Sequence, residues 1–453
     1  MIFKNISKTK LSLALISLVI TFFVWQQGLR ESLSRPSVSF DISQKEYEIA
    51  ELARQSIPTN LQKFFIINDP IDEINKALSQ VAFNELTERN KLIQIISSNS
   101  NQYEIDKNIF KDFENENYNL LIDEIEKKSN NNSYKPNFDK FYLFKDDRFL
   151  YHLLSNKFDF DDSSIITISF SRKMFLKIIF IRLIPLLTIL IGSILALKTL
   201  WKTISLKKFG WKEIKPLDLQ LIDMVLLIGG GFVVLGEVVS PLFSISLVEL
   251  FSKNISNELS QSLKIFFGYL FMAIPPLLIV YYQIKSLNGE FILKQDYFQF
   301  NFLPIKDAII QGIKGWLTIV PFVLLISLIM NSLIETQNGS NPLLEIVLNN
   351  NNYLSFILLF VTTTLIAPLF EEIIFRGILL PTLSRDFGII LGIIVSAFIF
   401  ALAHLSLGEM LPLFVLGIGL GITRVASGSL LSSVTMHSLW NGLTFLNLFL
   451  LRT

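Results

Sequence analysis

Apolar residues gather in long runs near the N-terminus and again after residue 175. A helix needs about 20 residues to cross a hydrocarbon core of about 30 Å, and several of these runs approach or exceed that length. The first run is Leu11–Trp25, and the later ones are Ile178–Leu197, Leu219–Val239, Ile265–Ile284, Trp316–Ile334, Tyr353–Leu380, Ile389–His404, Leu411–Ala426 and Leu430–Leu450. The pattern predicts an all-α polytopic membrane protein with about eight to nine transmembrane helices.

Residues 30–172 interrupt this pattern and predict an N-terminal extramembrane domain. Positions 30–170 carry 17 Lys/Arg and 24 Asp/Glu and contain no apolar run of spanning length. The apolar residues of "SQKEYEIAELARQ" and "IDEINKALSQVAFNELTERNKLIQII" recur at helical spacing. By contrast, "KFYLFKDDRFLYHLL" and "SIITISFS" are typical of short strands, the first with an Asp-Asp turn. We expect an α+β or mainly helical domain, without catalytic spacing.

The first apolar run follows three lysines, a pattern shared by cleaved signal peptides and uncleaved signal anchors. The next residues, "QQGLRESLSRPS", contain no small-x-small cleavage pattern, which favours the anchor. In either case the segment that follows is predicted to be exported.

Lysine and arginine are distributed unevenly among the predicted loops, which indicates the orientation in the membrane. The loop after Leu197 holds six lysines, and the next loop on that side holds four. Arg385 and Arg424 fall in later loops on the same side, whereas the opposite loops "ETQNGSNP" and "NNNN" lack both residue types. We therefore expect a multi-pass protein of a bacterial-type plasma membrane, with residues 30–172 on the exported side.

Composition narrows the chemistry that the chain can perform. It contains no Cys, which excludes disulfides, thiolate zinc sites and thiol nucleophiles. Its net charge is +1, and no basic run with interleaved aromatic residues indicates nucleic-acid binding. Any histidine chemistry depends on three residues, of which His152 lies in the charged domain and is predicted to be a surface or packing residue; the others are His404 and His437.

Three charged residues stand inside a predicted membrane span, in "PLFEEIIFRG" at 368–377. A charge at the bilayer centre costs about 2.5–3.5 kcal/mol on insertion scales, so three together indicate a function. Glu372 and Arg376 are spaced i,i+4 with the acid first, the favourable order for an ion pair on a helix. Glu371 lies about 100° away around the helix and is left free to take a proton.

Further polar residues follow in the last spans. Phe400 and His404 share one helix face, and so do His437 and Asn441. Counting residues from the turns "SRDFG" and "GS" at about 1.5 Å per residue places Glu371, His404, His437 and Asn441 at similar depths. Four helices can thus bring them to one interior layer.

The ordered motifs "EEIIFR" (371–376), "FALAH" (400–404) and "HSLWN" (437–441) resemble those of the CPBP family. These are the CAAX-protease and bacteriocin-processing intramembrane proteases, also called the Abi family. The resemblance covers about residues 350–445 and excludes the charged domain. It implies a CPBP/Abi-like catalytic core (346–453), which would follow a signal anchor or signal peptide (1–29), an exported soluble domain (30–172) and N-terminal transmembrane helices (173–345).

The resemblance also implies an activity, the hydrolysis of a peptide bond in a membrane protein or lipidated peptide. Glu371 with His404 would activate water, and His437 with Asn441 would hold or polarise the scissile carbonyl. The family is often labelled metalloprotease, and a Zn²⁺ ion held by His404, His437 and Glu371 is one alternative. A metal-free mechanism based on glutamate is the other. Few hydrogen-bonding partners for His404 are visible in the sequence around it, which slightly favours the metal-free mechanism.

Two functions of other classes compete with this hypothesis. One is a non-enzymatic membrane scaffold or immunity-type protein of the same fold, in which the polar side chains only bond neighbouring helices. The other is a proton-coupled transporter, which would spread its acids along a path through several helices. The polar residues gather in the last four spans, which favours a single site. Glu237, late in its span, is predicted to be a helix-end residue.

Overall fold

The computed structural model describes residues 7–35, 38–83, 86–97, 116–130, 134–160, 166–206, 210–212, 214, 218–251, 255–288, 304–333, 342–348, 350 and 352–452. Within these residues every regular element is a helix and no strand occurs, so the all-α prediction for the membrane protein is confirmed. The chain folds into two compact units. One comprises residues 39–185 and 450–453, and the other comprises residues 1–38 and 186–449.

The unit of residues 39–185 is built from short helices. They are α2 (Val38–Ala53), η1 (Arg54–Ser56), α3 (Thr59–Phe65), α4 (Pro70–Ser79), α5 (Glu88–Ser97), α6 (Glu116–Asn130), η4 (Phe138–Phe144), α7 (Arg148–Phe158) and the first part of α8 (Ile168–Leu206). The two segments with helical spacing are indeed helical, the second as α4 and α5. The second segment forms two helices because α5 has its own N-terminal cap. The Thr87 hydroxyl accepts the backbone N–H of Asn90 at 3.3 Å and starts α5.

The strand predicted for "KFYLFKDDRFLYHLL" is wrong, because this segment forms η4 and α7. The Asp-Asp pair is a helix cap rather than a hairpin turn: the Asp147 carboxylate accepts the N–H of Leu150 at 3.1 Å. Apolar side chains of α7 are buried on several faces, so their pattern does not distinguish strand from helix. Of "SIITISFS", residues 164 and 165 lie outside the described residues, and Ile168–Ser171 begin α8 rather than a strand.

The unit of residues 1–38 and 186–449 contains the apolar helices. They are α1 (Lys8–Ser34), the later part of α8, α9 (Leu221–Val225), η5 (Leu226–Val239), α10 (Ser240–Glu249), α11 (Asn257–Asn288), α12 (Ile305–Leu333), α13 (Pro342–Leu348), α14 (Tyr353–Val361), η7 (Thr362–Ile366), α15 (Ala367–Glu372), η8 (Ile373–Leu379), α16 (Leu380–Phe387), α17 (Ile389–Leu402), α18 (Met410–Ser427) and α19 (Leu430–Leu450). In the described part of the chain, seven helices are long and apolar enough to cross a membrane, and α17 is a shorter apolar helix.

Among the described residues of this unit, three segments are π-helical, and each ends two residues before a proline. These segments are η5, η7 and η8, followed by Pro241, Pro368 and Pro381. Their ends show the i→i+5 bond, for example from the N–H of Leu380 to the carbonyl of Phe375. A proline cannot donate to the carbonyl four residues earlier, and its ring crowds that carbonyl, so the wider turn relieves the conflict. Two of these segments flank α15, which carries the adjacent glutamates.

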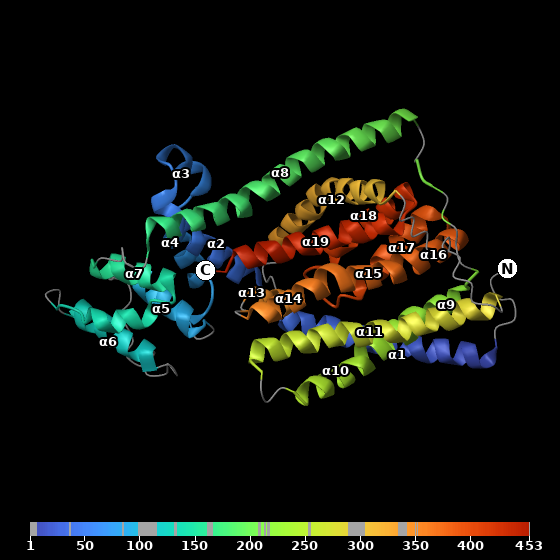
Figure 1. Cartoon of the computed structure of the whole chain (residues 1–453), viewed down its shortest axis with the longest axis horizontal. Coiled ribbons are helices and arrows are strands. Elements are labelled where there is room, and N and C mark those ends of the chain that lie inside the picture. The colour runs from blue at the N-terminus through green and yellow to red at the C-terminus, as the bar shows by residue number, and fades with distance from the viewer. Residues whose placement is uncertain are drawn as a thin grey trace. The chain divides into compact units, whose positions relative to one another are not determined.

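Aromatic packing joins these elements into one core. Phe232 of η5 stacks on Phe370 of α15 with ring centroids 5.8 Å apart, and Phe375 of η8 meets Phe400 of α17 edge-on at 5.4 Å. In Figure 1 the orange helices α16 and α17 and the red helix α18 lie next to one another in sequence order, and the blue helix α1 packs against η5 and α9. The core thus packs against the short segment that carries Glu371, Glu372 and Arg376.

Some positions differ from the sequence-based expectations. Arg424 does not lie in a loop but in the last turn of α18, where it is 1% exposed. Glu237 is not at a helix end, because α10 continues the helix beyond η5. The predicted orientation rests partly on residues outside the described ones: Lys207, Lys208, Lys215, Lys294, the loop 335–341 and parts of "NNNN".

Candidate active site

The centre of the candidate site is a buried ion pair. Arg376 Nη1 lies 2.9 Å from Glu372 Oε1, and both side chains are completely buried. The pairing predicted from the i,i+4 spacing is confirmed. Arg376 also donates from Nη2 to the carbonyl of Gly417 on α18 at 3.3 Å, and its guanidinium lies 4.2 Å from the Phe400 ring centroid. The charge of Arg376 is therefore held by a carboxylate, a carbonyl and an aromatic face.

His437 of α19 joins this pair through its Nδ1 atom. Nδ1 lies 3.0 Å from Glu372 Oε1, although the two residues are 65 positions apart. Since a carboxylate only accepts, this contact fixes the proton on Nδ1 and leaves the Nε2 lone pair of a neutral imidazole available. The arrangement Arg376–Glu372–His437 thus orients a basic nitrogen, in the way that a carboxylate orients the histidine of a hydrolase triad.

Glu371 faces the other side of the same imidazole. Its Oε2 lies 3.8 Å from His437 Nε2, too far for a direct hydrogen bond. This oxygen is buried and has no hydrogen-bond partner in the described part of the chain. Two acceptors at this separation can share one water molecule, because each can take one of its two protons. The imidazole beside Glu371 is that of His437, whereas the resemblance implied His404.

His404 follows the last turn of α17 and is only partly buried. Its Nδ1 lies 2.8 Å from the carbonyl of Phe400, so a neutral ring donates from Nδ1 and presents a lone pair at Nε2. The ring meets Phe400 edge-on at 4.7 Å, and Phe400 also contacts His437 at 5.6 Å. Phe400 therefore contacts both imidazoles. The sequence did not reveal this partner of His404, which is a backbone carbonyl one helical turn earlier.

Asn441 lies one turn beyond His437 on α19, as predicted. Its Nδ2 donates to the carbonyl of Thr363 in η7 at 2.9 Å. A side-chain amide has two N–H groups, so one donor remains after this bond. The contact fixes the amide against the helix that leads to the two glutamates.

Other residues that shape the site were not predicted from the sequence. Gly417 supplies a carbonyl to Arg376, and a Cβ there would lie 2.9 Å from that of Ala397. Ser396, also fully buried, donates to the carbonyl of Phe375 at 3.0 Å. Tyr269 of α11 lies within electrostatic range of both Glu371 and Glu237. The alternate glycines of "GIGLG" at 417–421 were the available signal for a close helix approach.

The donor chemistry of the site suits a metal ion, but the arrangement of the donors does not. Both histidines carry a partner on Nδ1, as metal-ligating histidines do. The expectation that His404 has few such partners, which slightly favoured the metal-free mechanism, is therefore wrong. However, no three His, Cys, Asp or Glu side chains among the described residues are grouped so as to hold a metal ion. As arranged, the residues do not form a three-ligand zinc site.

Comparison with known families supplies two matches. Residues 353–443 match the model of the family described as type II CAAX prenyl endopeptidase Rce1-like, and residues 39–176 match a domain of unknown function (DUF8675). No curated protein and no solved structure matches the chain. The first match confirms the resemblance inferred from the three motifs, and it spans α14 to most of α19 with all the candidate site residues. With the apolar helices, it supports an integral multi-pass membrane protein.

Proposed function

We propose that this protein is an intramembrane endopeptidase that hydrolyses a peptide bond of a membrane-associated protein or lipidated peptide. The observation that carries the proposal is the buried array of Arg376, Glu372 and His437, with Glu371 Oε2 at 3.8 Å from His437 Nε2. The match of residues 353–443 to a family of prenyl endopeptidases supports the same reaction class. A prenylated C-terminal peptide is accordingly the first substrate to try.

In the proposed mechanism, a water molecule binds between Glu371 Oε2 and His437 Nε2. Both atoms accept its hydrogens, so a lone pair of the water oxygen faces the substrate. The water attacks the scissile carbonyl carbon, and Glu371 takes one of its protons as general base. Glu371 then returns this proton to the leaving nitrogen, which gives a free amine and a carboxylic acid. The remaining N–H of Asn441 is one donor for the developing oxyanion.

Glu372 and Arg376 have a supporting role in this proposal. The carboxylate of Glu372 holds the Nδ1 proton of His437, and Arg376 compensates the charge of Glu372. His404 would stand beside the substrate and accept a hydrogen bond at Nε2. No step passes through a metal ion, because the described side chains do not group into a three-ligand set.

The proposed topology follows the lysine and arginine distribution, which puts residues 30–172 on the exported side of a bacterial-type plasma membrane. The domain boundaries predicted at residues 29, 172 and 345 are part of this proposal too. The site itself would lie within the bilayer, among the helices α14–α19.

The decisive experiment uses the purified protein in liposomes with a panel of prenylated and unprenylated membrane-associated peptides. We expect mass spectrometry to detect one internal cleavage and Glu371→Gln to reduce its rate about 10²–10⁴-fold, the usual contribution of a general base. Glu249→Gln is the matched control, because that side chain is 61% exposed. Full activity of Glu371→Gln on a cleaved peptide would refute the mechanism. Binding or proton transport without any cleavage would instead support the scaffold or transporter function.

A further inference from the structure

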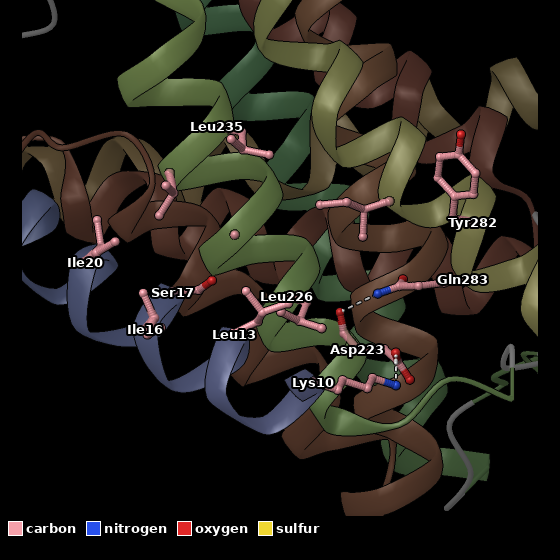
Figure 2. A pocket seen from close by; sticks show the side chains of 13 residues that line it. Lys10, Leu13, Ile16, Ser17, Ile20, Asp223, Leu226, Leu235, Tyr282 and Gln283 are labelled. Carbon is pink, nitrogen blue, oxygen red and sulfur yellow. Dashed lines mark hydrogen bonds and ion pairs between the residues drawn. The ribbon is translucent and has the colours of Figure 1, made fainter. Parts of the chain in front are cut away.

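The N-terminal helix α1 packs along the membrane unit. Lys10 Nζ lies 2.6 Å from Asp223 Oδ1 of α9, at the end of a groove of about 630 Å³ between α1, η5 and α11 (Figure 2). Near the middle of α1, Thr21 donates to the carbonyl of Gly229 in η5 at 3.4 Å. A Cβ on Gly229 would lie 3.1 Å from the Thr21 hydroxyl, so the two helices are close. These contacts make α1 an integral helix of the unit.

The C-terminal end of α1 contacts the turn that carries His404. The Ser32 hydroxyl accepts the backbone N–H of Leu407 at 3.2 Å, and Arg35 Nη1 donates to the carbonyl of Leu405 at 3.3 Å. A Cβ at Gly28 would lie 2.8 Å from Leu405 Cδ1, so a larger residue at position 28 would displace that side chain. Three contacts thus converge on residues 405–407, directly after His404.

The backbone of this turn is unusual and needs such support. Leu405 has a φ of 49°, in the left-handed region. A residue with a bulky side chain adopts this region only where its surroundings hold it there. Because Leu405 follows His404 directly, contacts that hold Leu405 also restrain the backbone at the end of α17, and thereby the direction in which it presents the imidazole. The contacts from α1 are therefore placed to hold that direction.

We infer that the C-terminal end of α1 positions His404, with Gly28, Ser32 and Arg35 as positioning residues. The catalytic consequence rests on the proposed function, whereas the contact itself does not. The inference assigns a role to a helix that lies outside the region matching the endopeptidase family. It also requires α1 to stay attached to the working protein, as a signal anchor and not as a removable signal peptide.

A cross-link tests the contact without any assay of activity. The chain has no Cys, so the pair Gly28→Cys and Leu405→Cys gives two unique thiols in the full-length protein. We expect rapid disulfide formation on mild oxidation in native membranes. The control pair Leu15→Cys and Leu405→Cys should not link, because Leu15 lies 13 residues before Gly28 on α1, about 20 Å along the helix. Equal linking of both pairs, or loss of α1 from the isolated protein, would overturn the inference.

Two further variants test positioning, each against a neighbour on the same helix. Ser32→Ala and Arg35→Ala remove the contacts. The control Ser34→Ala removes a hydroxyl that donates to the Glu31 carbonyl of its own helix, and the control Arg30→Ala removes an exposed side chain.

The readout is the imidazole signal of His404 in ¹⁵N-histidine-labelled protein in micelles. Only three histidines contribute, and His404→Gln assigns the signal. We expect Ser32→Ala and Arg35→Ala to shift it, to lower kcat about fivefold per lost hydrogen bond and to leave KM within about twofold. The controls should change neither, and Arg35→Lys should restore most of the loss. An unshifted His404 signal in both variants would refute positioning. If the parent protein cleaves nothing, the cross-link and the spectrum still decide this inference, independently of the proposed function.

Discussion

At the scale of single residues, Glu372 has the most constrained environment of the site. It is fully buried, and a single oxygen, Oε1, receives both Arg376 and His437. Removing a charge from a buried pair leaves its partner without compensation, which costs far more than the pair contributes. The ion pair is therefore expected to govern stability, while the neighbouring Glu371 governs the reaction.

Substitution of Arg376 should distinguish the contribution of the ion pair to stability from the contribution of Glu371 to the reaction. Arg376→Ala should lower the free energy of unfolding by about 3–5 kcal/mol, because Glu372 stays buried without its cation. The double variant Glu372→Gln with Arg376→Met removes both charges and should recover most of that stability, as judged by thermal unfolding in detergent. It should not recover activity, because His437 loses the carboxylate that fixes its Nδ1 proton. If Arg376→Ala had the same melting temperature as the parent protein, this assignment of stability to the ion pair would be refuted.

Whether cleavage requires a metal ion also depends on a few single residues, those that could act as ligands. The described side chains do not gather three ligands, so we expect purified active protein to keep its rate after treatment with a strong chelator. Elemental analysis before and after treatment provides the measurement. The opposite result would be stoichiometric zinc whose removal abolishes cleavage and whose return restores it. Glu371 would then serve as a ligand or base beside the ion.

At the scale of elements, the helices of residues 39–185 meet at a charge cluster. Arg89 at the start of α5 lies 2.6 Å from Glu48 of α2 and 2.6 Å from Asp147 at the start of α7. Burial disfavours the charged form of Asp147, but the charge and hydrogen bonds of Arg89 outweigh it and hold the pKa of Asp147 below its ordinary value of 3.8. Three helices are thus tied to one guanidinium.

The lowered pKa predicts an acid sensitivity of α5 and α7. The stabilisation by ionised Asp147 is fully present above its ordinary pKa and is lost as the pH falls through its lower folded-state pKa. Hydrogen exchange in these helices, corrected for intrinsic rates, should therefore accelerate below about pH 4 in the full-length protein. Asp147→Asn should remove most of this dependence, while Asp139→Asn serves as the control. Identical pH profiles for parent and Asp147→Asn would refute the assignment.

At the scale of the whole molecule, the distribution of positive charge predicts which side of the membrane each segment faces. The lysine-rich loops predict that residues 30–172 are exported. A cysteine at the exposed position Asn60 should react with an impermeant maleimide in intact cells, whereas one at Ser205 should react only after lysis. The chain has no native thiol to interfere. The reverse labelling pattern would mean that the orientation is inverted.

Features that depend on local spacing could be predicted from the order of the amino acids alone. The apolar runs predicted the helices because burying backbone groups in lipid leaves few alternatives to a helix. The i,i+4 spacing predicted the contact between Glu372 and Arg376, because residues four apart meet on one helix face. The three ordered motifs predicted the family resemblance of residues 353–443. The strand expected at 140–154 failed because a capping aspartate and a turn aspartate look alike in sequence.

Which distant groups meet depends instead on how the helices pack. The His437 ring could have faced either glutamate or a backbone carbonyl, and helix packing brings it to Glu372. The contact between Ser32 and Leu407 joins residues 375 positions apart, and no periodicity in either segment indicates it. Such pairs depend on the crossing and rotation of whole helices, which are set by side chains spread over the entire core. Local patterns therefore predicted the parts of the site, and packing decided how they are assembled.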